Sequence, residues 1–147
     1  MSASQIHKLR LRSNAFVANL DNIKTKIVEG NTYLENLNKQ QLRNHKLADD
    51  SEMKHGLSKS YAAWKAENFA SSYDGGLPNF FLTGNLFRNM FIKVSKSSYV
   101  INSKVDYAAG LVSYFGQGFG IAPSNHQKAQ KNTTDRLRIE YKTLVLK

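Results

Sequence analysis

The strongest structural signal in the sequence is "MFIKVSKSSYVINSKV", from Met90 to Val105. It contains two runs rich in β-branched and aromatic residues, separated by the polar residues 95–98, and this pattern predicts a β-hairpin over 90–105. Side chains of different character alternate along both runs, so one face of the hairpin is expected to be core and the other mixed.

The residues before the hairpin predict a short helical turn. In "FLTGNLFRNM", Thr83 can accept a hydrogen bond at a helix start, and Gly84 tolerates a tight backbone approach. Residues 85–89 then supply one turn of helix, which delivers the chain into the hairpin.

Two helices are predicted after the hairpin. The first covers 106–115, because Asp106 is a typical N-cap residue and Gly116 a typical end. A glycine-rich loop follows, and Ser124 is expected to cap a polar helix over 124–138.

The N-terminal segment 1–30 is predicted to be helical. Apolar residues from Phe16 to Ile27 recur at steps of four, three and four, which is one stripe of a helix that Gly30 would end. The next segment, 33–42, fits either an extended strand or a short helix. Residues 44–79 are polar with few periodic apolar positions, so they are expected to form an extended surface segment with little regular structure.

These elements predict an α+β fold in a single domain, 1–147. A small antiparallel sheet, built on the central hairpin, would pack against helices, and long extended arms would leave this body. The expected core residues are Phe16, Leu20, Ile23, Leu86, Ile92, Val94, Val100, Ile101, Ala108, Leu111 and Val112.

The composition and charge of the chain limit the classes of function to be expected. The chain has 147 residues, no cysteine and a formal net charge of +10, which suits contact with a polyanion or an acidic surface. No run of 18 apolar residues occurs, so no membrane contact is expected. The basic residues are spread out, with one small group at Lys8–Arg12 and another at Lys128–Lys142, which is typical of a solvated surface.

No pattern of catalytic or metal-binding residues emerges. Asp49, Asp50, Glu52 and His55 are close in sequence, but they lack the spacing of a calcium loop, and a solvated acidic turn is the preferred interpretation. The glycines of 116–120 lack the Lys-Ser/Thr of a phosphate-binding loop and indicate a flexible connection. We therefore expect neither a cofactor nor an enzyme activity.

The order of short motifs resembles a known family. "LTGNL" at 82–86, a hairpin, "VDYAA" at 105–109 and "FG" at 115–116 are similar to tailed-phage virion morphogenesis proteins. These include tail-completion, head–tail joining and minor tail proteins, and the likeness extends upstream to "YAAWK" at 61–65. It covers roughly residues 33 to 140, with 80–140 as the family-like core. The matched motif residues are Leu82, Thr83, Gly84, Leu86, Tyr107, Ala108, Phe115 and Gly116.

The resemblance implies a structural role in a virion. Such a protein is made in the host cytoplasm and forms a homo-oligomeric ring at the head–tail connector or the tail end. Its partners would be copies of itself, portal, connector or tail-tube proteins, and the packaged DNA. The residues expected at interfaces are Tyr61, Trp64, Arg136 and Arg138. The alternative is a small basic module that binds nucleic acid.

Overall fold

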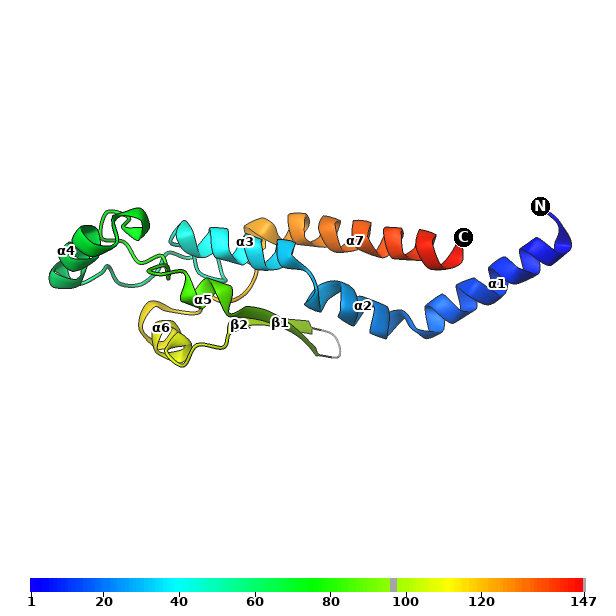
Figure 1. Ribbon diagram of the computed structural model, residues 1–147, viewed down its shortest axis with the longest axis horizontal. Coiled ribbons are helices and arrows are strands. Elements are labelled where there is room, and N and C mark those ends of the chain that lie inside the picture. Colours follow the sequence, from blue (N-terminus) through cyan, green and yellow to red (C-terminus); the bar gives the residue numbers. More distant parts are fainter. Residues whose placement is uncertain (96–97, 147) are drawn as a thin grey trace.

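A computed structural model describes residues 1–95 and 98–146, and it confirms the α+β class. Helices lie beside one antiparallel hairpin, and the molecule is long, with α1 at one end and α4 at the other (Figure 1). The elements in chain order are α1 (Ala3–Ala18), α2 (Leu20–Glu29), α3 (Thr32–Arg43), α4 (Lys59–Asn68), the 3-10 turn η1 (Ala70–Ser72), α5 (Asn85–Arg88), β1 (Met90–Ser95), β2 (Ser98–Ser103), α6 (Ala108–Phe115) and α7 (Pro123–Val145).

The predicted hairpin is confirmed. Strands β1 and β2 pair antiparallel, with Ile92 opposite Ile101 and Met90 opposite Ser103. These four side chains are buried, so they form the inner face. The predicted turn at 95–98 includes residues 96–97, which lie outside the described residues.

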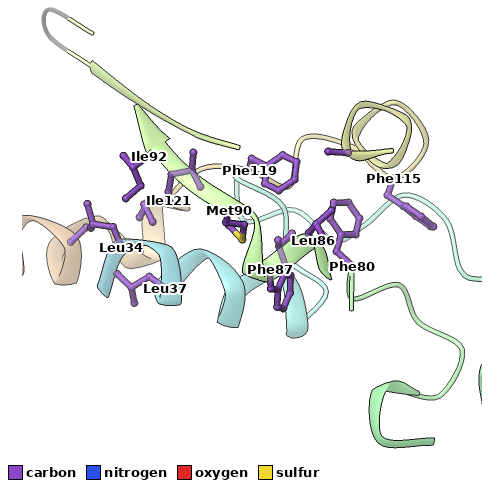
Figure 2. Close-up of a cluster of buried hydrophobic side chains, with 14 residues drawn as sticks. Leu34, Leu37, Phe80, Leu86, Phe87, Met90, Ile92, Phe115, Phe119 and Ile121 are labelled. Carbon is purple, nitrogen blue, oxygen red and sulfur yellow. The ribbon is translucent and has the colours of Figure 1, made fainter. Parts of the chain in front are cut away.

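The main core lies between α3 and the inner face of the hairpin (Figure 2). Leu34 and Leu42 of α3 are almost completely buried in it, which settles the open interpretation of 33–42 as a helix. The buried members are Leu34, Leu37, Leu42, Phe80, Leu86, Phe87, Met90, Ile92, Ile101, Ala108, Phe115, Phe119, Ile121 and Ala129.

The prediction that Val100 belongs to the core is wrong. The side chain of Val100 is 54% exposed, because it alternates with buried Ile101 along β2 and therefore points to the opposite face. Most other predicted core positions are buried, and the remainder are partly buried: Leu20, Val94, Leu111 and Val112.

The N-terminal segment contains two helices rather than one. Asn19 leaves the helical conformation (φ −105°, ψ 13°), and its own N–H bonds back to the carbonyls that end α1. The side chain of Asn19 accepts a hydrogen bond from Asn22 at 2.7 Å, which favours a new helix start over continuation. Ser2 caps α1, and it does so in a capping box with Gln5.

A second, smaller core holds the N-terminal helices to α7. Phe16, Ile23 and Val145 are buried together, and the ring of Phe16 meets that of Tyr141 edge-on at 5.2 Å between centroids. These contacts explain why α7 continues to Val145, seven residues beyond the predicted end at 138.

The prediction for 44–79 is wrong in part, because α4 lies within it. Ser58 caps this helix by accepting a hydrogen bond from the Tyr61 N–H. The segment around α4 also contains Ala, Lys and Glu, which favour helix without producing an apolar stripe.

The glycine-rich loop is held in place rather than flexible. Asn38 of α3 donates to the carbonyls of Gly118 and Gly120 at 2.8 and 2.7 Å. Gln41, one turn later, accepts from the Ala122 N–H at 2.8 Å and donates to the Leu47 carbonyl at 3.0 Å. Two buried amides of one helix therefore position the whole connection between α6 and α7.

Candidate functional site

A cleft of about 640 Å³ opens between α4, α6 and the chain that leads into α5. Its walls are mainly aromatic and aliphatic. The lining residues are Gly56, Leu57, Ser58, Tyr61, Lys65, Pro78, Phe80, Phe81, Leu82, Thr83, Asn85, Leu86, Tyr107, Leu111, Tyr114 and Phe115. This volume and lining are typical of a ligand-sized site.

Half of the motif and interface residues singled out from the sequence meet at this cleft. Leu82, Thr83, Leu86, Tyr107 and Phe115 line it, although the chain between the first and the last is more than thirty residues long. The interface candidate Tyr61 lines the opposite wall, from α4. The remaining motif residues, Gly84, Ala108 and Gly116, are next to lining residues in the chain.

Three tyrosines lie at the exposed rim of the cleft. Tyr61, Tyr107 and Tyr114 each leave a third or more of the side chain in solvent, with Tyr107 at 50%. The motif residue Tyr107 is therefore a rim residue of the cleft. Trp64 stacks on Tyr61 with ring centroids 5.5 Å apart, so the candidate pair extends the aromatic surface outward.

Buried aromatic rings form the inner wall. The rings of Phe80 and Phe115 lie 5.7 Å apart, and Tyr114 meets Phe115 edge-on at 4.8 Å. Phe80 has a left-handed backbone (φ 54°), an unusual conformation for an aromatic residue. The contact with Phe115 and the main core fixes its side chain in that position.

Lys65 is the residue that the sequence interpretation missed. Its side chain is only 3% exposed, and its Nζ donates to Asn79 Oδ1 at 3.0 Å. Burial lowers the pKa of the Lys65 ammonium, and the carboxylate of Asp74 opposes part of that shift. The spacing of Tyr61 and Lys65 was the available signal, since residues four apart share one face of a helix.

Asn79 ties Lys65 to the wall of the cleft. Its Oδ1 also accepts from the Phe81 N–H at 3.1 Å, and its Nδ2 donates to the Ser72 carbonyl at 3.1 Å. The loop before α5 is therefore fastened to α4 through one amide side chain.

A second fastening comes from the end of α3. The two ring nitrogens of His45 lie 2.8 Å from the Pro78 carbonyl and 2.9 Å from Asp74 Oδ2. The backbone of His45 is left-handed (φ 60°), which is unusual for a residue other than glycine, and it lies at the point where this contact is made.

The turn at 83–89 forms without the predicted Thr83 cap. Gly84 is the N-cap of α5 with φ 76°, and no side-chain hydrogen bond closes the helix start. Arg88 Nη1 instead donates to the Thr83 carbonyl at 3.0 Å. A Cβ at Gly84 would lie 3.0 Å from the Phe81 ring, so glycine is required there by conformation and by space.

The acidic residues at 49–52 are engaged separately rather than gathered around one point. Asp49 accepts from Ser51, Asp50 reaches Ser124, and Glu52 pairs with Lys46 at 3.2 Å. Within residues 1–95 and 98–146, no group of three or more metal-ligating side chains forms.

The basic groups lie away from the cleft. Arg136 and Arg138 are on α7, and Lys8, Arg10 and Arg12 are on α1, which has no acidic residue. In Figure 1 α1 forms the end of the molecule opposite α4, and α7 runs from beside α3 toward that end. The interface candidates therefore divide into an aromatic pair on α4 and a basic pair on α7.

Comparison with protein-family models, with curated proteins and with solved structures finds no significant match to this chain. In the part of the chain that the structure describes, no helix combines the length and apolar character needed to cross a membrane.

Proposed function

We propose that this chain is a structural subunit of a tailed-phage particle and that it forms a ring at the head–tail connector or the tail end. The observation that carries the proposal is helix α1. It extends beyond the body of the molecule (Figure 1), and Phe16 alone among its sixteen residues is buried.

An isolated helix of this length is marginal in water, because tertiary packing supplies most helical stability. Helix α1 packs against α7 through Phe16, with Leu9 partly buried against the same small core. Ile6, Leu11 and Val17 remain exposed large apolar residues on it. Contact with a neighbouring subunit would give this helix the packing that its own chain does not supply.

The two ends of the molecule differ, which favours a head-to-tail arrangement. One end presents a basic helix with exposed apolar residues, and the other presents the aromatic cleft with Tyr61 and Trp64. Contacts between unlike surfaces generate rings when the rotation between subunits closes. The order of the motifs at 82–86, 105–109 and 115–116 resembles that of tailed-phage virion proteins, and for this reason we propose that the ring belongs to a phage particle.

Sedimentation velocity of the full chain over a range of concentrations tests the assembly. We expect a closed oligomer that dissociates when both Ile6 and Leu11 are replaced by Glu. Asn14→Glu, an exposed polar position on the same helix, is the matched control and leaves the oligomer intact. A monomer at every concentration overturns the ring. If mass spectrometry does not detect the chain in purified virions, the virion role is overturned.

The alternative, nucleic-acid binding, is favoured by one specific feature. Helix α1 carries Lys8, Arg10 and Arg12 with no acidic residue to offset them. Fluorescence anisotropy with duplex DNA at increasing salt tests it. Nucleic-acid binding is supported if the affinity falls steeply with salt and is lost when these three basic residues are replaced by Ala. Binding that is absent or insensitive to salt contradicts it.

A further inference from the structure

We propose that the cleft between α4 and α6 binds an apolar carboxylate, that is, a ligand with one carboxylate group on an aromatic or aliphatic body. The carboxylate would meet Lys65, and the body would lie against the aromatic walls. All the residues that line the site belong to a single chain, although the proposed head-to-tail contact uses the same end of the molecule.

The charge of the cleft points to an anion. Among the described residues that line it, Lys65 has the one charged side chain, and none is Asp or Glu. Among the described residues, no carboxylate oxygen lies within 4.0 Å of its ammonium. The more distant carboxylate of Asp74 offsets only part of the cost of burying this ammonium, and a bound carboxylate in direct contact would offset more of it.

The hydrogen-bonding capacity of Lys65 agrees with this charge argument. An ammonium group has three donors, and Asn79 Oδ1 at 3.0 Å accepts one of them. A carboxylate oxygen can accept another in a charge-assisted hydrogen bond, which is stronger than a neutral one.

The walls determine the rest of the ligand. Phe80, Leu86 and Phe115 are buried apolar side chains on one side, and Tyr61, Tyr107 and Tyr114 supply partly exposed rings at the rim. Such a surface gains free energy by covering an apolar body, whereas a strongly polar ligand such as a sugar or a phosphate would lose its hydration there. The volume of about 640 Å³ accommodates a body of two fused rings.

Lys65 also has a structural contact, which the test must separate from ligand binding. Its bond to Asn79 helps to fasten the loop before α5. Replacing Lys65 by Met keeps the long apolar stem, and Asn79 Oδ1 retains the Phe81 N–H as a donor. Lys59→Met is the matched control, because Lys59 is exposed on the same helix.

Isothermal titration calorimetry at pH 7 with two matched pairs of probes tests the proposal. One pair is naphthalene-2-carboxylate and its neutral carboxamide; the other is N-acetyl-Leu-Phe with a free or an amidated C-terminus. We expect the carboxylate to bind at least tenfold more tightly than its amide in the wild-type chain and in Lys59→Met. In Lys65→Met, with its fold verified by circular dichroism, this preference is lost.

The pairs also identify the source of the carboxylate. Preference for the naphthoate alone indicates a free small acid, and preference for the peptide indicates the C-terminus of a chain; either supports the site. Equal binding of acid and amide, or no binding of any probe, overturns it, and this comparison needs only the wild-type chain. A carboxylate preference that persists in folded Lys65→Met also overturns it.

Discussion

The carboxylate of Asp50 caps helix α7 from a distant part of the chain. Asp50 Oδ2 accepts from the Ser124 N–H at 2.8 Å, and the side chains of the two residues are also hydrogen-bonded. The residue at the N-cap position of α7 is Ala122, which has no side-chain acceptor of its own. The loop at 49–52, whose acidic residues suggested a solvated turn, therefore supplies the missing cap.

Replacing Asp50 by Ala should destabilise the first turn of α7. The hydrogen bonds from the Ser124 hydroxyl and then from its backbone N–H hold the pKa of Asp50 below its usual 3.8. A lowered pKa means that the stabilisation is fully present above pH 3.8 and is lost as the pH falls through the pKa of the folded state. Amide hydrogen exchange at Ser124 measures this directly, and it should accelerate in the variant.

Asp49→Ala is the control for this experiment. Its carboxylate accepts only within its own turn, from Ser51. Exchange at Ser124 should therefore be unchanged. If both variants accelerate it equally, Asp50 has no specific capping role.

Gly118→Ala should destabilise the protein by about 1–3 kcal/mol, the usual cost of overpacking. An added Cβ would lie 2.6 Å from Leu42 Cδ2 and 2.9 Å from Phe80 Cε2, and both side chains belong to the main core. Gly110→Ala is the opposite case, because α6 leaves open space there and alanine favours helix by about 1 kcal/mol. Urea denaturation of both variants should give shifts of opposite sign.

Ile101→Ala should cost about 2–5 kcal/mol, because the side chain is almost completely buried on the inner face of the hairpin. Val100→Ala, one position earlier on the outer face, should change the free energy of unfolding by about 0.5 kcal/mol or less. Similar losses from both variants would contradict the register of β1 and β2.

Lys65 should give the free energy of unfolding a distinctive pH dependence. Burial lowers its pKa in the folded state below 10.5, so the unfolded chain binds more protons between these two values. The free energy of unfolding therefore rises with pH across this window, relative to Lys65→Met. Chemical denaturation of both proteins from pH 7 to pH 10.5 measures the difference, and parallel curves would contradict it.

The hairpin and the presence of two helices after it were predictable because their signals are local, but the predicted caps Asp106 and Ser124 are wrong, since the N-cap positions are Tyr107 and Ala122. Alternation in 90–105 and the glycine at 116 each act through neighbours in sequence. The break at Asn19 was missed because an apolar stripe runs across it, from Phe16 to Ile23, and gives no sign of a change in direction.

The contacts that shape the site were not predictable from local sequence. Asn38 reaches Gly118, and Asp50 reaches Ser124, across more than seventy residues. Helix α4 was not predicted from periodicity, because its inner face is made by Tyr61 and a buried Lys65 rather than by an apolar stripe. Five of the motif residues line one cleft together with Lys65, a juxtaposition that only the packing shows.

The junction at Asn19 makes α1 a lever arm. Sixteen helical residues extend about 24 Å, so a rotation of about 10° at this one residue moves the far end by about 4 Å. The small core around Phe16 lies close to this junction, and Leu9 is its farthest contact along α1. In the proposed ring, copies of this chain could adjust the spacing between neighbours by turning one helix, while the hairpin and the cleft keep their shape.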